Sequence, residues 1–326
     1  MAYFLIPATK PGYSDCLLII CMSLIVSTST YAGPRNVAAI DLPVAWTLKL
    51  APSFTYGNYK DSPTLDHVTS VGVDADIQYL ERGGLTIAAS TTTLTMKSSV
   101  PNFLQNNTFI SGRLNLTPDA LPGLFTLRAD VHRATNNDAT NETNDVSVIA
   151  PLLSFINFNK NYYFDLGYTL SRYGDSNNIN LTDTTLLVRQ WTPTVGIGFN
   201  HGADWLQLRL YDIQVSNPSR AQGFSRTDAL EAKWTHYLWP GSWMPEQVQL
   251  SAMAGSRIYA VDSDTKVLYN IADLQRSGVL AGVQWRFSAH VKLLLNAGYD
   301  RYETQSTGIV TSYSGSYFYT GLRVQM

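Results

Sequence analysis

The sequence predicts an all-β fold, a transmembrane antiparallel up-and-down β-barrel of about 14 strands. Segments in which apolar and polar residues alternate recur along the chain, as in strands with one face in lipid and one in a polar interior. The connections between them are alternately short and long, which is typical of barrels with short periplasmic turns and long extracellular loops. Because only a closed barrel satisfies the backbone of strands in lipid, the periodicity also implies closure.

The first 32 residues are expected to be a signal peptide rather than part of the fold. Lys10 supplies a positive charge, an apolar run of ten extends from Leu17 to Val26, and small residues lead to cleavage after Ala32. The alternatives are an uncleaved membrane anchor and a lipoprotein at Cys21. Residues 33–43 are then a periplasmic N-terminal segment, and residues 44–326 form the barrel.

Composition excludes several classes of protein. Both cysteines, Cys16 and Cys21, lie in the signal, so no disulfide, cysteine nucleophile or cysteine-rich zinc site is expected after its removal. The formal net charge of −2 is not that of a nucleic-acid-binding protein. Nineteen tyrosines, seven tryptophans and a charged fraction of 15% suit a protein with one face in lipid.

Each of the first seven predicted strands carries an apolar stripe that is expected to face lipid. In chain order the stripes are Trp46, Leu48, Leu50, Phe54 and Tyr56; Val71, Val73, Ala75, Ile77 and Tyr79; Leu85, Ile87 and Ala89; Ile110, Gly112, Leu114 and Leu116; Phe125, Leu127, Ala129 and Val131; Val146, Val148, Ala150 and Leu152; and Tyr162, Phe164, Leu166, Tyr168 and Leu170. The fifth strand alternates most cleanly, because Arg128, Asp130 and His132 separate its apolar residues.

The second seven strands follow the same rule. Their stripes are Trp191, Val195, Ile197 and Phe199; Leu206, Leu208 and Leu210; Leu230, Ala232, Trp234 and Leu238; Val248, Leu250, Ala252 and Ala254; Val279, Ala281, Val283, Trp285 and Phe287; Val291, Leu293, Leu295, Ala297 and Tyr299; and Phe318, Leu322, Val324 and Met326. Pro52, Pro151 and Pro193 fall inside strands, where each removes a ladder hydrogen bond that a bulge could absorb. Counts of twelve or sixteen strands, or a large soluble β-sandwich, are the alternatives.

The connections assign the two ends of the barrel. Long polar connections are expected at residues 60–66, 98–107, 136–144, 174–184, 216–227, 262–270 and 303–309, and short ones at 81–84, 118–123, 157–161, 200–204, 239–246 and 288–290. Both termini then lie on the periplasmic, short-turn side.

The last eight residues resemble the C-terminal β-signal of bacterial outer-membrane proteins. The positions that match this signal are Tyr319, Gly321, Val324 and Met326, with Met326 where Phe or Trp is usual. The resemblance implies a Gram-negative outer-membrane protein inserted by the outer-membrane assembly machinery. Periplasmic chaperones, outer-membrane lipid and lipopolysaccharide are the other expected partners. The strand arrangement, without a shared motif, is also that of long-chain fatty-acid transporters, monomeric sugar porins and surface-lipoprotein translocators.

Charged residues that alternate with the stripes are expected to line the lumen. The basic ones are Lys49, Arg113, Arg128, Arg209, Lys233, Arg257, Arg276, Arg286, Lys292 and Arg323, and the acidic ones are Asp74, Asp76, Asp130, Asp165, Glu231 and Asp300. This excess of basic groups favours a water-filled lumen that prefers polar or anionic solutes. The alternative is that the charges pair across strands and fill a closed interior.

The sequence therefore predicts a porin-like channel for small polar solutes, with anions favoured, and not an enzyme. A non-conducting barrel acting in export, surface-lipoprotein or envelope assembly, or adhesion is the first alternative. A hydrolase is the second, using Asp130 and His132 at the rim or His236 on the lipid face. No catalytic residue, metal site or cofactor is assigned, because no nucleotide-binding or metal-ligand spacing occurs.

Overall fold

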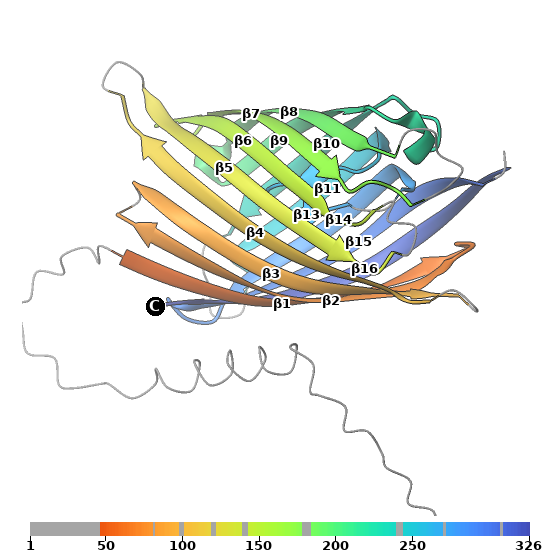
Figure 1. Cartoon of the computed structure of the whole chain (residues 1–326). Coiled ribbons are helices and arrows are strands. Elements are labelled where there is room, and N and C mark those ends of the chain that lie inside the picture. The colour runs from red at the N-terminus through yellow and green to blue at the C-terminus, as the bar shows by residue number, and fades with distance from the viewer. Residues whose placement is uncertain are drawn as a thin grey trace, which may run out of the picture. The chain divides into compact units, whose positions relative to one another are not determined.

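The computed structural model describes residues 46–80, 82–97, 101–118, 122–138, 143–177, 184–238, 244–269, 272–306 and 309–326. The predicted signal peptide and N-terminal segment lie outside these residues. Fourteen strands close into an antiparallel barrel in which each strand pairs with its neighbours in the chain (Figure 1). The predicted fold class and strand number are thereby confirmed. Within the described residues, no helix is both long and apolar enough to cross a membrane.

The barrel strands have the following bounds: β1 (Trp46–Lys60), β2 (Leu65–Tyr79), β3 (Gly83–Met96), β4 (Phe103–Leu116), β5 (Gly123–Asn136), β6 (Val146–Asn157), β7 (Tyr162–Tyr173), β8 (Leu186–Phe199), β9 (Asp204–Val215), β10 (Arg226–Tyr237), β11 (Gln247–Arg257), β14 (Leu274–Arg286), β15 (Val291–Ser306) and β16 (Ile309–Gln325). A separate two-stranded hairpin consists of β12 (Val261–Asp262) and β13 (Val267–Leu268). Two short 3-10 turns complete the described elements, η1 (Asn200–Gly202) and η2 (Pro218–Arg220).

The barrel closes between its first and last strands. β1 pairs with β16 from Lys49 opposite Gln325 to Lys60 opposite Ser314. Beyond that ladder, the Met326 backbone N–H donates to the Leu48 carbonyl at 2.8 Å. Both edges of the last strand are therefore paired, as a lipid environment requires.

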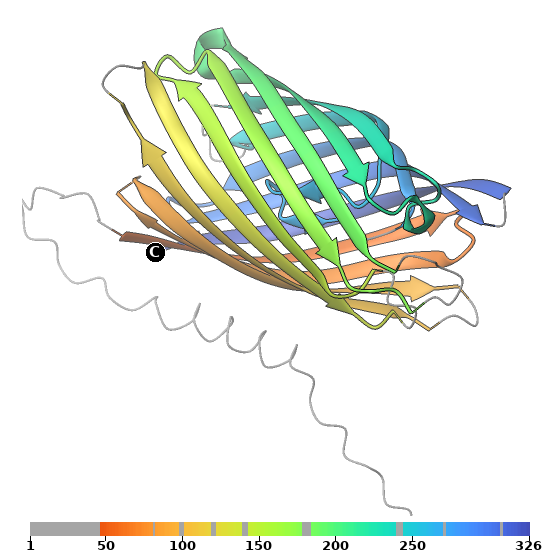
Figure 2. The ribbon, with the colours of Figure 1, turned by 45° about the horizontal axis from the view of Figure 1, so that its top comes forward.

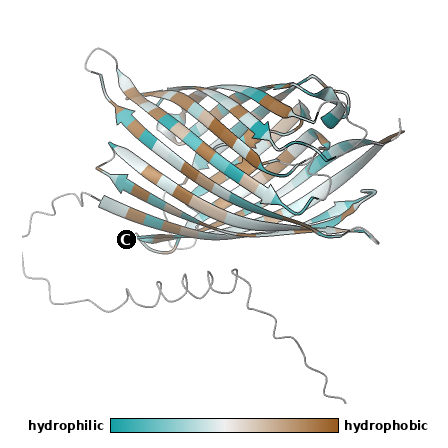
Figure 3. Ribbon diagram, in the orientation of Figure 1, coloured by the Kyte–Doolittle hydropathy of each residue, from teal (hydrophilic) through white to brown (hydrophobic). Residues whose placement is uncertain are grey.

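The outer surface carries the apolar band that the stripes predict, except on β6. Exposed large apolar residues such as Leu127, Phe164 and Val195 lie on the predicted stripes of the other strands, and Figure 3 shows the alternation of apolar and polar residues along the strands. In β6 the prediction is wrong, because Val148 is fully buried inside the barrel whereas Ile149 is 58% exposed. Both faces of this strand are apolar, so its alternation does not say which face meets lipid.

The three strand prolines each coincide with a gap in one ladder, without a bulge. The β1–β16 ladder skips Pro52, the β6–β7 ladder skips Pro151 and the β8–β9 ladder skips Pro193, yet the register is the same on both sides of each gap. The register shifts lie elsewhere, for example between Ala254 and Arg257 where β11 meets β14. Proline removes its own hydrogen bond here and leaves the pairing of its neighbours intact.

Two of the expected long connections are short. β15 continues to Ser306, the register partner of Ile309 at the start of β16, so the described part of the predicted loop at 303–309 is paired strand that reaches beyond the rest of the barrel (Figure 1). β1 likewise ends at Lys60 and β2 begins at Leu65. Polar residues in these segments pair as strands, because strand pairing continues above the lipid band where an apolar stripe is no longer required.

Candidate channel lumen

The connection between β11 and β14 folds into the barrel instead of extending outward. Residues 258–269, here called the lumen hairpin, contain β12 and β13 and lie within the ring of strands (Figures 1 and 2). Four consecutive residues, Ile258 to Val261, are at most 2% exposed. The sequence analysis placed residues 262–270 in an extracellular loop, and this placement is wrong for the described part. The apolar run Ile258–Val261 was the signal for an inward fold, since it has no place in a solvated loop.

The lumen hairpin is attached to one wall of the barrel by hydrogen bonds and ion pairs. Gln190 on β8 donates to the Val261 carbonyl at 2.7 Å and accepts from the Val261 N–H at 3.0 Å. Arg209 on β9 lies 3.7 Å from the Asp262 carboxylate and also pairs with Asp264. Because the Arg209 and Asp262 side chains are little exposed, solvent screens their pair less than it screens surface pairs.

The tip of the lumen hairpin reaches the opposite wall. Lys266 pairs with Asp74 on β2, and Asp264 lies 3.5 Å from Arg128 on β5. In the order of the closed sheet, β2 and β9 are seven places apart among fourteen strands, so they face each other across the barrel. The lumen hairpin therefore spans the diameter of the lumen.

A dry apolar cluster closes the loop end of one sector of the lumen. Its members include inward-facing residues of β6 to β9 and the base of the lumen hairpin: Val146, Val148, Tyr173, Leu186, Val188, Tyr211, Ile213, Ile258, Tyr259, Ala260 and Val261. The Tyr259 hydroxyl donates to the Arg220 carbonyl in η2, which ties the β9–β10 connection to the same cluster. Water is excluded here by packing, not by charge.

On the other side of the lumen hairpin lies a polar cavity of about 90 Å³. Arg209, Lys233, Arg257, Glu231 and Asp300 are among the residues that line it. The Arg257 guanidinium is held by the Gln275 side chain at 2.6 Å and lies 4.4 Å from the centre of the Tyr269 ring. The structure thus brings five of the predicted lumen residues together around one polar space.

Comparison with known proteins adds information about the fold alone. No protein-family model matches the chain, and no curated protein resembles it in sequence. The monoaromatic hydrocarbon channel CymD is similar in structure, with a TM-score of 0.53 and 8% identity over 86% of this chain and 88% of that one. The chain has the fold of bacterial outer-membrane β-barrel proteins.

Two other solved structures of this fold are less similar. The Pseudomonas putida toluene transporter TodX gives a TM-score of 0.49 at 7% identity, covering 87% of this chain and 90% of its own. Omp33 of Acinetobacter baumannii gives a TM-score of 0.42 at 6% identity, and the match covers 86% of this chain and 99% of Omp33.

As an outer-membrane barrel with an apolar outer band, the protein lies in the bacterial outer membrane with its strands crossing the lipid.

Predicted lumen residues gather at the short-turn end of the outer-membrane barrel in what we call the basic mouth. Its five basic residues, from β1, β4, β14, β15 and β16, are Lys49, Arg113, Arg286, Lys292 and Arg323. Lys49 is the register partner of Asp76, and Lys292 is that of Arg323. Asp76 lies 3.6 Å from Arg113.

Glu246, in the connection before β11, is the second acidic residue of the basic mouth and was not selected from the sequence. Its carboxylate is 2.5 Å from the Arg286 guanidinium and 2.6 Å from the Lys292 ammonium. Burial opposes ionisation of Glu246, but hydrogen bonds from Lys292 and Gln284 and the charge of Arg286 outweigh it, so the pKa of the carboxyl lies below its ordinary value. Five cations against two carboxylates leave the mouth net positive.

One predicted lumen residue, Arg276, lies at the β14 bulge. Its guanidinium pairs with Glu303 at 2.7 Å and with Ser256. The bulge between Gln275 and Ser277 shifts the alternation of this strand, which the sequence analysis had continued unbroken.

The residues considered for hydrolysis have other partners. Asp130 takes a hydrogen bond from Arg128 at 3.0 Å, whereas the buried His132 ring packs edge-on against Phe109 at 4.6 Å between ring centres. On the outer face, His236 lies 2.7 Å from Asp204, which also accepts from the Trp234 indole at 3.0 Å. In the described residues no group of His, Cys, Asp and Glu could hold a metal ion.

Proposed function

We propose that the protein is an outer-membrane channel for small polar solutes, with anions favoured, in which the lumen hairpin limits the open cross-section. The observation that carries the proposal is the basic mouth, where Lys49 and Arg323 have no acidic side chain in salt-bridge distance in the described part of the chain. Clustered charge of one sign at a narrow entrance raises the local concentration of the opposite ion.

Selectivity is assigned to the basic mouth rather than to the whole interior. Halfway through the barrel, Arg128 and Arg209 are matched by Asp262 and Asp264 of the lumen hairpin and by neighbouring carboxylates on the wall. The sixteen lumen charges expected from the sequence therefore do not act as one basic surface. A solute that passes the hairpin meets paired charges, and one at the mouth meets free cations.

The test is the reversal potential of single channels in a planar bilayer under a salt gradient. The variant Arg286→Glu/Lys292→Glu/Arg323→Glu is expected to move the reversal potential from the anion side to the cation side. Arg301→Gln is the matched control, because this arginine is exposed on the outer face of β15. A reversal potential that is the same in the wild type and the triple variant would contradict the assignment.

The second candidate is a non-conducting barrel that serves export, surface-lipoprotein or envelope assembly, or adhesion. The observation that favours it is the dry cluster, which fills the loop end of the lumen beside β6 to β9. This second candidate function predicts that the purified wild-type protein does not conduct and that conductance appears once the lumen hairpin is shortened. The porin-like proposal predicts conductance in both.

A further inference from the structure

A row of arginines lies on the outer face of the barrel at the loop end of β5 to β10. Arg133, Arg172, Arg189 and Arg226 are exposed, whereas inward neighbours such as Val188 are buried. At this level the strands carry charged residues outside and apolar residues inside, which is the reverse of their arrangement within the lipid band. The next outward residues toward the short-turn end of β5, β7 and β8 are apolar: Val131, Leu170 and Trp191. The arginine row therefore marks the level where the lipid band ends and phosphorylated headgroups begin.

Two members of this row lack acidic partners. Arg133 pairs with Asp145, and Arg226 lies 3.0 Å from Asp212. In the described part of the chain no acidic side chain pairs with Arg172 or Arg189. These two residues lie on adjacent strands, and Arg172 is the register partner of Leu187, two residues before Arg189. That diagonal offset separates them by roughly 7–8 Å, close enough to hold phosphate oxygens of one ligand.

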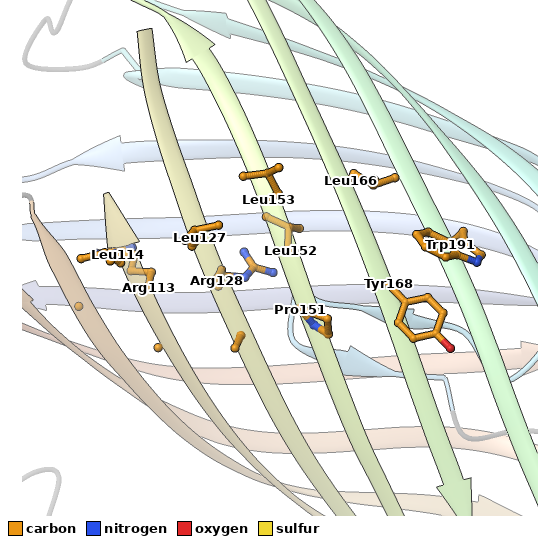
Figure 4. Close-up of a pocket in the computed structure, with 13 residues that line it drawn as sticks. Arg113, Leu114, Leu127, Arg128, Pro151, Leu152, Leu153, Leu166, Tyr168 and Trp191 are labelled. Carbon is orange, nitrogen blue, oxygen red and sulfur yellow. The ribbon is translucent and has the colours of Figure 1, made fainter. Parts of the chain in front are cut away.

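A largely apolar groove is lined by outward-facing residues of β3 to β8, further along the strands that carry the arginines, with Arg113 and Arg128 also in its lining. Its volume is about 700 Å³, and Figure 4 shows the side chains around it. Gly112, Ala129 and Pro151 contribute little side chain, whereas Leu127, Leu153 and Trp191 are its larger members. A Cβ at Gly112 would meet nothing within 4 Å, so the hollow is open there. Small residues between large ones leave a channel that fits an alkyl chain.

The distances between the groove and the arginines match a lipid with a charged head. Trp191 is two residues from Arg189 on β8, and Tyr168 is four residues from Arg172 on β7. At about 3.3 Å per residue these separations are roughly 7 and 13 Å. A ligand with phosphates at one end and acyl chains at the other would occupy both features at once.

We propose that the outer face of β5 to β8 is a binding site for the phosphorylated glycolipid of the outer leaflet, the lipid A part of lipopolysaccharide. Arg172 and Arg189 hold phosphate through the guanidinium fork, a geometry that suits phosphate better than a point charge does. An acyl chain fills the groove and buries its apolar floor. The two free arginines favour a head with more than one phosphate over a phospholipid with a single one.

The test is native mass spectrometry of the full barrel refolded in lipid-free detergent. The probes are diphosphoryl lipid A, its dephosphorylated form and phosphatidylglycerol. Diphosphoryl lipid A is expected to bind at least tenfold more tightly than either of the other two. Arg172→Gln/Arg189→Gln should lose that advantage, and Arg301→Gln, on the outer face of β15, should keep it.

A second variant tests the groove independently of charge. At Gly112 a Cβ meets nothing within 4 Å, so Gly112→Leu should let the barrel fold with normal heat-modifiable mobility while its side chain takes up space in the hollow. We expect it to weaken binding of diphosphoryl lipid A severalfold with both arginines intact. Equal binding of phosphorylated and dephosphorylated lipid A, equal binding of phosphatidylglycerol, or unchanged binding by the arginine variant would each overturn the site.

Discussion

At the scale of single residues, the character of a lumen arginine depends on partners far away in the sequence. Arg128 alternates with lipid-facing residues, and its guanidinium lies 3.0 Å from the Asp130 carboxylate two residues further along β5. Its second partner, Asp264, is 136 positions away and comes from the lumen hairpin. A charge that the local pattern presents as free is thus compensated by the fold.

The first prediction concerns Asp264. Asp264→Asn removes the carboxylate that faces both Arg128 and Arg209, so the lumen hairpin should lose part of its attachment, at a cost of about 1–3 kcal/mol. Single-channel recordings should show higher conductance and stronger anion preference than in the wild type. Asp145→Asn, which removes a pair on the outer rim, is the control. Lower or unchanged conductance would mean that Asp264 does not hold the hairpin in the path of solutes.

Glu246 gives a second prediction, with a defined pH dependence. Because its pKa lies below the ordinary value, the Glu246 carboxylate is charged at pH 5 and above, and its charge is lost only as the pH falls through that lowered pKa. Glu246→Gln should therefore raise the anion preference at pH 7, by freeing Arg286 and Lys292. The reversal potential checks this result, and the difference between wild type and variant should persist at pH 5. A difference that disappears by pH 5 would show that Glu246 is already protonated there.

At the scale of elements, the proline gaps show how much irregularity a barrel strand tolerates. Pro151 interrupts the β6–β7 ladder, whereas its pairing with Ala129 on β5 continues. The backbone carbonyl on β7 that would accept from residue 151 has no ladder partner there. Only the hydrogen bond at Pro151 is lost, because β6 and β7 keep the same register on both sides of the gap.

The third prediction follows from this gap. Pro151→Val supplies the missing N–H in a residue type that suits strands, so the barrel should gain about 1 kcal/mol of stability. Urea unfolding in detergent, followed by the heat-modifiable band, measures the change. Leu153→Val, on the same outward face with its ladder pairs intact, is the control and should not raise the midpoint. A Pro151 variant with a lower midpoint would mean that the proline ring itself shapes the wall.

The limits of sequence prediction are also clearest in individual elements. In strands such as β5, which have charged residues on one face and apolar residues on the other, the sequence predicts the lipid-facing side correctly, because only the apolar face can meet lipid. In β6, Val148 and Ile149 are both apolar, and Val148 is the one that points inward, where it belongs to the same buried cluster as the base of the lumen hairpin. The pattern of one strand contains no information about that contact.

At the scale of the whole molecule, closure of the barrel could be predicted, and the contents of the lumen could not. Closure follows from the requirement that every strand edge be paired in lipid, which holds for any sequence of this class. The path of residues 258–269 depends on matches to separate strands, such as Gln190 with Val261 and Asp74 with Lys266. Such matches arise only when the strands are already in place.

The fourth prediction tests whether the lumen hairpin controls passage through the barrel. Val261 and Leu268 are register partners, so residues 262–267 can be replaced by Gly-Gly in a two-residue turn without disturbing β11 or β14. The change removes Asp262, Asp264 and Lys266, and with them the link across the diameter. The base of the hairpin, including the bonds between Gln190 and Val261, remains.

Conductance in a planar bilayer is expected to rise severalfold in this deletion variant, since the obstacle across the lumen is gone while the wall is intact. Arg128 and Arg209 also lose their hairpin partners, so the anion preference should increase in the same recordings. Heat-modifiable mobility equal to that of the wild type would show that the barrel still closes. Unchanged conductance in a correctly folded variant would place the limiting constriction at the basic mouth or in the dry cluster instead.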